Sequence, residues 1–344
     1  MKNNAIKICA ILFCTAFLSI DAMAEPRPVW VVGHACNSHR CLQDMLKDGG
    51  CGVEIDIHSD IQHKFTEWSI NHGGGFLNKT TRDSRNNARD NDLDYYVTLE
   101  EYLDFAEMKD ISILWLDVKT GEYVAELMQH VHKILEKKYK GKNKQPYSII
   151  YGLYKAEHLE TPITPNYTAI DMLRDSLWDK EGINLAFEGK ARTQKYGSGT
   201  LDDISSVLNR HKFPAHKHFM SCGWFNSTTV NRYTVEVKSI RGARELRKKK
   251  EYCSRVGFWS CGYYSHAIWA ISPAWTKGAV DIACDLVLVE CRNEFMWPDD
   301  QYSLQKLVNN YFKKNGCYYK KYNNDRDRIA TQKDVFYDSK MLGQ

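Results

Sequence analysis

Residues 29–34 read VWVVGH, an almost continuous apolar run that ends in a histidine. A second run of this kind, LVLVE, occupies residues 286–290 in the last third of the chain. Strands that are buried on both faces have such unbroken apolar runs, and they are typical of parallel sheets covered by helices. The two runs therefore predict a mostly parallel sheet whose strands come from most of the chain.

Between these runs, short apolar or β-branched segments alternate with segments of helical periodicity. The predicted strands are Val29–His34, Gly52–Ile57, Ile111–Val118, Ser148–Leu153, Asn184–Glu188, His218–Ser221, His266–Ile271 and Asp285–Glu290. The predicted helices are Leu42–Lys47, Leu99–Met108, Tyr123–Tyr139, Ala169–Trp178, Leu201–Arg210, Arg232–Lys250 and Trp275–Ala283. Alternating strands and helices in these numbers predict an α/β fold, a single (β/α)8 TIM barrel. A doubly wound open sheet is the alternative, although no GxGxxG motif follows any strand.

The N-terminus has the pattern of a signal peptide. Lys2 and Lys7 precede an apolar run of 13 residues at positions 8–20, which is too short to span a bilayer. A small-x-small cleavage site ends at Ala24. We therefore expect residues 1–24 to be removed after Ala24 and the protein to be secreted, not transmembrane. The barrel domain then covers residues 25–298, and residues 299–344 form a C-terminal helix, Ser303–Lys313, and a tail.

Composition excludes several classes of protein. The chain has 344 residues, of which 43% are apolar and 26% charged, values typical of globular proteins. The 47 basic residues nearly balance the 43 acidic ones, which argues against a dedicated nucleic-acid-binding protein. We expect a monomer without a nucleic-acid partner.

Cysteine usage fits an exported protein. Two of the 11 cysteines, Cys9 and Cys14, lie in the predicted signal peptide, and the rest have no CxxC spacing. Outside the cytosol most of them should form disulfides, and Cys36 with Cys41 is a plausible local bridge just after the first strand.

Polar side chains gather where the first three predicted strands end. His34 ends the first strand, and Glu54 and Asp56 lie two residues apart on the second, so both point to the same face. Asp117 and Lys119 have the same spacing on the third strand. His72 precedes three glycines at the start of a long polar segment, residues 71–97. In a barrel of this kind the carboxyl ends of the strands meet at one mouth, where active sites lie.

This set of residues favours phosphoryl transfer. Glu54, Asp56 and Asp117 offer hard oxygen ligands that suit Mg²⁺ or Ca²⁺, and Lys119 offers a positive charge for a phosphate. Two imidazoles can exchange protons near neutral pH. A carboxylate pair alone would also suit a glycosidase. Each residue on its own has an ordinary structural interpretation, such as a hydrogen-bonded histidine or an ion pair between Asp117 and Lys119.

Four stretches in this region resemble a known family. They are RPVWVVGH (27–34), VEID (53–56), HG (72–73) and LDVKTG (116–121). Together they resemble the sphingomyelinase D/phospholipase D toxins of spider venoms and some bacteria, which are secreted barrel enzymes related to glycerophosphodiester phosphodiesterases. The similarity extends in order from about Arg27 to Cys291 and is strongest over the first third of that range.

The resemblance implies a role for each residue of the set. His34 and His72 would be the catalytic pair, and Glu54, Asp56 and Asp117 would bind one Mg²⁺ ion. Lys119 would bind phosphate, and Trp269 would line the headgroup pocket. The family cleaves the headgroup ester of sphingomyelin and lysophospholipids at membrane surfaces, typically by internal hydroxyl attack that gives a cyclic phosphate.

This chain departs from the family pattern at three points. The toxins usually have a cysteine shortly after the second histidine, whereas residues 73–91 contain none. Glu290 stands where many members have asparagine, and Ser272 stands where an aspartate is expected. These changes leave the headgroup preference open. The alternatives are a glycerophosphodiester phosphodiesterase that hydrolyses small soluble diesters, or a catalytically inactive barrel that binds lipid.

Overall fold

The computed structural model describes residues 30–47, 50–62, 64–72, 97–186, 200–223, 255–261 and 286–290. The strands are β1 (Trp30–His34), β2 (Gly52–Ser59), β3 (Trp68–Ile70), β4 (Val97–Thr98), β5 (Ile113–Val118), β6 (Ser148–Leu153), β7 (Pro162–Thr164), β8 (Tyr167–Thr168), β9 (Glu181–Ala186), β10 (His218–Gly223), β11 (Arg255–Cys261) and β12 (Leu286–Glu290). The α-helices are α2 (His39–Lys47), α4 (Leu99–Asp104), α5 (Val124–Tyr139), α6 (Ala169–Ser176) and α7 (Leu201–Arg210). Short 3-10 helices are η1 (Ala106–Asp110), η2 (Gly121–Tyr123), η3 (Ala156–Glu160) and η4 (Ala215–Lys217).

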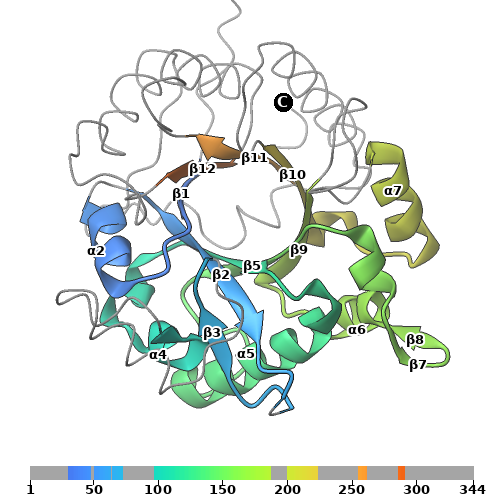
Figure 1. Ribbon diagram of the computed structural model, residues 1–344, viewed down its shortest axis with the longest axis horizontal. Coiled ribbons are helices and arrows are strands. Elements are labelled where there is room, and N and C mark those ends of the chain that lie inside the picture. Colours follow the sequence, from blue (N-terminus) through green and yellow to red (C-terminus); the bar gives the residue numbers. More distant parts are fainter. Residues whose placement is uncertain are drawn as a thin grey trace, which may run out of the picture.

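Most strands belong to one sheet of ten, in the order β1-β12-β11-β10-β9-β6-β5-β2-β3-β4. Neighbours from β1 to β2 along this order are parallel, and β1 also pairs with β2. β3 and β4 join antiparallel at the side of β2. Figure 1 shows the sheet curving so that β1 lies between β12 and β2. The predicted α/β class with a large, mostly parallel sheet is confirmed.

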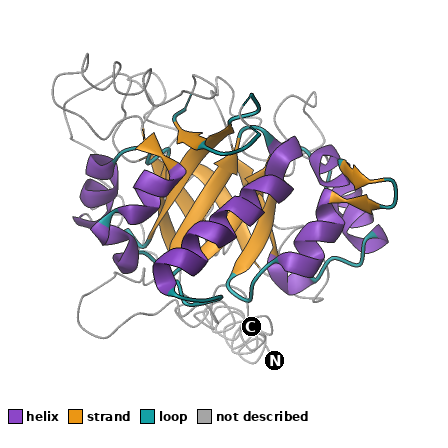
Figure 2. Cartoon of the chain, turned by 90° about the horizontal axis from the view of Figure 1, so that it is seen from below, coloured by secondary structure: helices purple, strands orange, loops and turns teal. Residues whose placement is uncertain are grey.

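Alternation along the strands separates two apolar cores. On β5, Leu114 and Leu116 belong to the main core with the helices, whereas Ile113 and Trp115 point to the opposite, inner face. Figure 2 shows the helices packed along the outer side of the strands. The inner cluster consists of Trp30, Val32, Cys51, Ile113, Trp115, Ile150, Phe219 and Leu288. Full burial of each large apolar side chain contributes about 1.5–3 kcal/mol, so both faces of the sheet hold it together.

Three helices begin with the same local motif. A threonine precedes α4, α6 and α7, and an acidic residue follows it three positions later; the pairs are Thr98 with Glu101, Thr168 with Asp171, and Thr200 with Asp203. In each pair the two side chains bond to each other's backbone N–H groups, which satisfies donors that a helix start leaves open. These capping boxes explain why the predicted starts of all three helices are correct.

Some predicted boundaries agree with the structure and others do not. β6 and α7 have the predicted bounds, whereas β9 begins at Glu181, three residues before the predicted start. Glu181 is fully buried and accepts hydrogen bonds from the Trp178 N–H and the Tyr151 hydroxyl. A charged residue therefore begins a buried strand here, and a prediction based on apolar runs does not detect it.

The short antiparallel strands β3, β4, β7 and β8 were not predicted, because two or three residues carry no periodicity. Ile70 of β3 pairs with Val97 of β4, at the two ends of the predicted long polar segment. Residues 73–96 of that segment lie outside the described residues.

Other predictions also fall outside the described ranges. They are the signal peptide, the strand His266–Ile271, the helices Arg232–Lys250 and Trp275–Ala283, and the C-terminal helix and tail. The strand between β10 and β12 is β11, which was not predicted. None of the helices in the described ranges is long and apolar enough to cross a bilayer.

Cys36 and Cys41 both lie in the main core, where they are 0% and 3% exposed. The Tyr102 hydroxyl donates to the Cys36 carbonyl at 2.8 Å, which anchors the chain just after β1. A disulfide between the two cysteines stays a prediction.

Gly152 on β6 leaves space for the indole of Trp115, and this close approach generates a prediction. A Cβ atom at position 152 would lie 2.3 Å from Trp115 Nε1. Overpacking of a buried site typically costs about 1–3 kcal/mol, so Gly152→Ala should lower the free energy of unfolding by that amount in urea denaturation.

The double variant Gly152→Ala/Trp115→Phe is the control, because the smaller ring makes room for the new methyl group. Its loss of stability should be less than the sum of the two single losses. Wild-type stability of Gly152→Ala would contradict this account of the contact.

Candidate active site

The residues predicted to form the site come from β1, β2 and β5: His34 ends β1, Glu54 and Asp56 lie in the middle of β2, and Asp117 lies near the end of β5. Glu54 and Asp56 point to the inner face of β2, and Asp117 of β5 is the register partner of Asp56. Lys119 follows β5 directly, and its N–H donates to the carbonyl of Ile57. Parallel pairing thus brings together side chains that are up to 85 positions apart in the sequence, from His34 to Lys119.

The three carboxylates form a tight buried cluster. Glu54, Asp56 and Asp117 each offer one oxygen, and these oxygens lie within 4.8 Å of one another. The three residues are only 1%, 0% and 4% exposed. Like charges so close together repel strongly away from water, and a divalent cation with oxygen ligands would remove that repulsion.

Asp56 provides the test of whether a cation fits. Asp56 Oδ1 is buried and ion-paired with Lys119, whose Nζ lies 2.5 Å away. A carboxylate oxygen has more than one lone pair, so Asp56 can still bind a hard cation such as Mg²⁺. The donor set therefore fits a divalent cation, as the sequence predicts.

Lys119 is the positive charge of the cluster. Its Nζ lies 2.5 Å from Asp56 Oδ1 and 2.6 Å from Asp117 Oδ2. Burial acts to lower its pKa, but the nearby Asp117, Tyr154 and Asp56 outweigh burial and hold the pKa of Lys119 well above its usual value. Lys119 therefore stays protonated and can attract a phosphate at this edge of the cluster.

Tyr154, which was not predicted, contacts both Asp117 and Lys119. Its hydroxyl donates to Asp117 Oδ2, and Lys119 Nζ lies 3.4 Å from the same hydroxyl and 5.2 Å from the ring centroid. Burial, followed by the charge of Asp117, raises the pKa of Tyr154 well above its usual value. Tyr154 is therefore a neutral donor. It comes directly after β6, and that position was the only signal in the sequence.

Asn37 is a second residue that the sequence analysis missed. Its Nδ2 donates to Asp56 Oδ2 at 2.7 Å, and its Oδ1 accepts from the Asp56 backbone N–H at 2.9 Å. The asparagine is 1% exposed. Asn in a loop after a strand is usually read as a turn residue, so nothing in the pattern marked it.

Glu54 is held by the loop that follows β1. The N–H of Ala35 donates to Glu54 Oε2 at 2.5 Å, and His34 Nε2 lies 4.0 Å from the same oxygen. Ala35 has a φ of 50°, a left-handed conformation that is unusual for a residue other than glycine and that is often retained at functional sites. Burial is the main cause that raises the pKa of Glu54 well above its usual value, and the neighbouring aspartates add to it.

His72 reaches the site through the antiparallel β2–β3 pair. The N–H of Asn71 donates to the carbonyl of Asp56 at 3.1 Å, which fixes the backbone next to His72. His72 is exposed, and its positive charge acts to lower the pKa of Asp56. The two side chains therefore interact electrostatically. The structure thus brings both predicted histidines to the cluster.

His58 is a third histidine near the cluster, and it was not predicted. It lies two residues after Asp56 on the same face of β2, and its Nε2 is buried without a hydrogen-bond partner. Burial, followed by the positive charge of Lys119, lowers the pKa of His58. A neutral imidazole is therefore available beside the two predicted ones.

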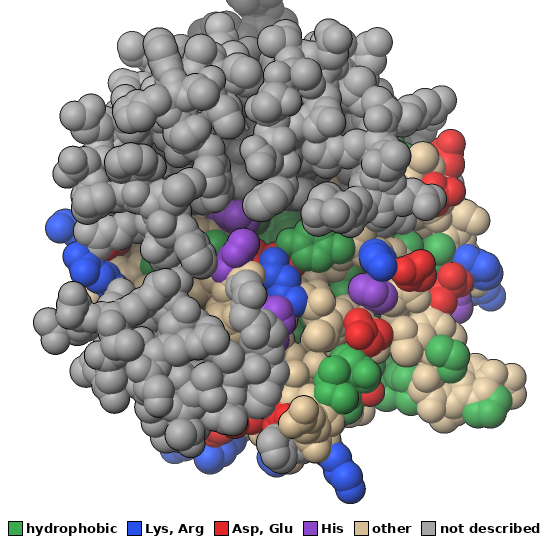
Figure 3. Space-filling view, viewed as in Figure 1, with side chains coloured by type: hydrophobic (Ala, Val, Ile, Leu, Met, Phe, Trp, Pro, Cys, Tyr) green, Lys and Arg blue, Asp and Glu red, His purple; other side chains and the backbone are tan. Residues whose placement is uncertain are grey.

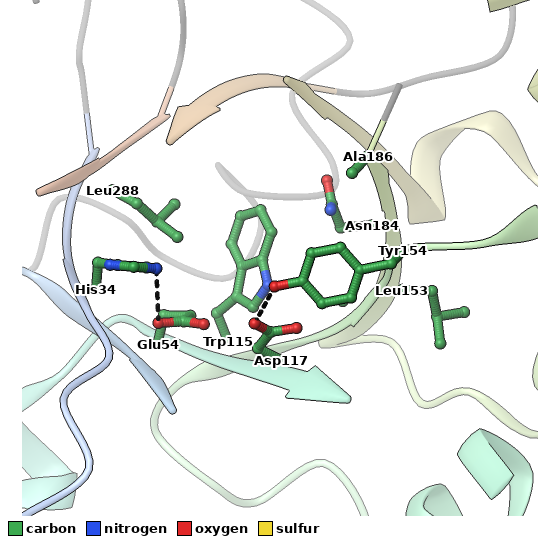
Figure 4. Close-up of a pocket in the computed structure, with 10 residues that line it drawn as sticks. His34, Glu54, Trp115, Asp117, Leu153, Tyr154, Asn184, Ala186 and Leu288 are labelled. Carbon is green, nitrogen blue, oxygen red and sulfur yellow. Dashed lines mark hydrogen bonds and ion pairs between the residues drawn. The ribbon is translucent and has the colours of Figure 1, made fainter. Parts of the chain in front are cut away.

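A pocket opens beside the cluster. Its lining residues are His34, Glu54, Trp115, Asp117, Gly152, Leu153, Tyr154, Asn184, Ala186 and Leu288. Figure 4 shows Trp115 between His34 and Glu54 on one side and the wall of β9 with Asn184 on the other. Figure 3 shows histidine and basic side chains together near the centre of the face viewed in Figure 1. The pocket therefore has an acidic side, a polar amide wall and an aromatic surface between them.

Two predicted features are not placed. Trp269 and the glycines that follow His72 lie outside the described residues. The backbone of Glu290 is placed, as the register partner of His34 at the end of β12. An acidic residue in place of the family's asparagine thus stands on the strand next to a predicted catalytic histidine.

Two solved structures show distant similarity to this chain. The arginine decarboxylase of Campylobacter jejuni matches with 10% identity and a TM-score of 0.38 over 77% of this chain and 40% of its own. A dihydropteroate synthase of Coxiella burnetii in complex with pteroic acid matches with 10% identity and a TM-score of 0.37 over 86% and 95%. The chain thus spans less than half the length of the decarboxylase. No curated protein sequence matches it.

One protein-family model matches a large continuous part of the chain. The model describes sphingomyelinase D/phospholipase D proteins and matches residues 24–259, well over half of the sequence. The matched range contains both histidines, the three carboxylates and Lys119. The chain therefore belongs to the sphingomyelinase D/phospholipase D family.

Proposed function

We propose that this protein is a secreted, Mg²⁺-dependent phospholipase D/sphingomyelinase D-like enzyme. It would cleave the headgroup phosphodiester of sphingomyelin and lysophospholipids at a membrane surface, as a monomer. The observation that carries the proposal is the buried cluster of Glu54, Asp56 and Asp117 beside Lys119, in a chain whose family consists of phospholipase D-type phosphodiesterases.

The proposed scaffold is a closed (β/α)8 barrel. The pairing of β1 with both β12 and β2 supports it, because those two contacts join the ends of a row of eight parallel strands. In such a barrel all strand ends that carry the cluster face one mouth, where this fold has its active sites.

The carboxylates and the lysine of the cluster would have different binding roles. Glu54, Asp56 and Asp117 would hold the cation, which when bound supplies positive charge to the phosphate oxygens and stabilises the charge of the transition state. Lys119 would hold a further phosphate oxygen by its fixed positive charge. The aromatic ring of Trp115 and the amide of Asn184 line the space left for the rest of the substrate.

The two histidines would move the protons of the reaction. One accepts the proton of the lipid hydroxyl as the oxygen of that hydroxyl attacks phosphorus. The other donates a proton to the headgroup oxygen as its bond to phosphorus breaks. The products are a cyclic phosphate and the free headgroup alcohol. These roles are supported by the 4.0 Å between His34 Nε2 and Glu54 Oε2 and by the hydrogen bond that ties Asn71, next to His72, to the carbonyl of Asp56.

Product analysis tests the proposal against its alternatives. Phosphorus NMR should show cyclic phosphate from sphingomyelin or lysophosphatidylcholine. Turnover of glycerophosphocholine alone, with an open phosphate product, would instead indicate a glycerophosphodiester phosphodiesterase. Absence of any turnover in the presence of Mg²⁺ would leave the lipid-binding alternative.

Activity should depend on a divalent cation, because three buried carboxylates would otherwise repel one another and the anionic substrate. EDTA should abolish turnover of lysophosphatidylcholine, and added Mg²⁺ should restore it. Asp56→Asn should prevent this recovery because it removes one ligand charge. Full activity in metal-free buffer would show the metal assignment to be wrong.

His34→Asn and His72→Asn should each lower kcat by about 10²–10⁴-fold, the usual contribution of general acid–base catalysis. The double variant should be hardly slower than the slower single variant, because both residues serve one reaction. His216→Asn, outside the site, is the matched control and should keep wild-type turnover.

Circular dichroism checks that the histidine variants fold. If a folded His34→Asn or His72→Asn variant keeps more than about a tenth of the wild-type rate, the role of that histidine is refuted.

A further inference from the structure

Each carboxylate of the cluster accepts one hydrogen bond from a neutral donor, on one of its two oxygens. The Ala35 N–H donates to Glu54 Oε2, and Asn37 Nδ2 donates to Asp56 Oδ2. The Tyr154 hydroxyl donates to Asp117 Oδ2. The donors come from the loop after β1 and from the residue after β6, so separate elements converge on the cluster.

From this pattern we infer that Tyr154 is a positioning residue that orients Asp117 for a bound divalent cation. The inference rests on the proposed metal site. A neutral donor fixes the direction of a carboxylate without cancelling the charge that attracts the cation. Outer hydrogen bonds of this kind commonly determine how well a site binds its metal.

The contacts of Asp117 favour this role over a purely structural one. Asp117 Oδ2 accepts from Tyr154 and also lies 2.6 Å from Lys119 Nζ. Two donors on Oδ2 leave Oδ1 for the cluster. Without the tyrosine hydroxyl, Lys119 alone would hold this carboxylate, and a flexible lysine fixes direction less well than a phenol on a strand end.

The ring of Tyr154 has a separate effect that a variant can preserve. Lys119 Nζ lies 5.2 Å from the ring centroid, and the ring lines the pocket. Tyr154→Phe keeps this ring and removes only the hydroxyl, so it isolates the hydrogen bond to Asp117.

The same strand offers a matched control. Tyr151 of β6 is fully buried, and its hydroxyl, like that of the partly buried Tyr154, donates to a carboxylate, here Glu181 Oε1 at 3.2 Å. Tyr151 belongs to the main core, on the other face of the sheet from the pocket. Tyr151→Phe therefore removes an equivalent bond away from the cluster.

The experiment measures cation binding to the full chain, with Mn²⁺ followed by electron paramagnetic resonance and Mg²⁺ by calorimetry. Tyr154→Phe should weaken both cations by about 10–100-fold, the usual effect of losing an outer hydrogen bond. Tyr151→Phe should leave both dissociation constants within about twofold of wild type, although it too loses a buried hydrogen bond.

Kinetics give a second readout. The Mg²⁺ concentration for half-maximal activity should rise in Tyr154→Phe by about the same factor as the dissociation constant, because both report the same binding step. At saturating Mg²⁺ its kcat should return to within about threefold of wild type, since the residue positions a ligand and takes no part in proton transfer.

If Tyr154→Phe does not fold, Tyr154→Gln and Tyr154→Met replace it, because the two side chains have similar length and only Gln can donate. Gln should then bind Mn²⁺ more tightly than Met. Equal cation binding by wild type and Tyr154→Phe, or by Gln and Met, would overturn the inference and leave the proposed function intact. A wild-type protein that binds neither cation would refute both.

Discussion

The contact of Lys119 with Asp56 and Asp117 is the interaction on which the site depends. Three carboxylates are buried within 4.8 Å of one another, and isolated buried charges are costly. Lys119 offsets part of that charge and is itself held in its protonated form by the same groups. One lysine does not balance three carboxylates. Burial raises the pKa of Glu54, and the charges of Asp56 and Asp117 add to that rise. The cluster therefore suits a cation in a way that an ordinary ion pair does not.

The fold makes this concentration of charge tolerable. The carboxylates lie on strands whose backbones are paired on both sides and whose outer faces pack into the main core. Inner side chains such as Trp115 and Leu288 exclude water next to the cluster. The paired strands therefore hold the three carboxylates close together although their charges repel one another. A bound cation would reduce that repulsion.

The sequence was enough to predict the residues that carry charge. Glu54 and Asp56 alternate with apolar residues on β2, Asp117 lies near the end of β5 and Lys119 follows it, and parallel pairing brings these positions together. The residues that were missed, Asn37 and Tyr154, act by hydrogen bonds to those charges. Their role depends on which strands are neighbours in space, and the pattern of a single chain does not contain that information.

The same distinction explains the errors in the fold. Ser148–Leu153 is fully buried and mostly apolar, and it was predicted with its exact bounds. β9 begins with Glu181, whose carboxylate contacts side chains from α5 and β6. Its Oε2 lies 2.7 Å from His132 Nε2, and its Oε1 accepts a hydrogen bond from the Tyr151 hydroxyl. β3 and β4 have too few residues for a periodic signal, and their pairing depends on β2. Local pattern predicts elements that are stable by burial, and tertiary partners determine the rest.

The pairing of β3 with β4 has a consequence for the position of His72. Ile70 and Val97 are register partners, so the chain leaves and re-enters the sheet at one place. His72 stands just beyond that point, and the N–H of Asn71 ties its backbone to Asp56. The histidine is thus anchored to the strand that carries two of the carboxylates, and a shift in the register of β2 and β3 would move the histidine relative to the cluster.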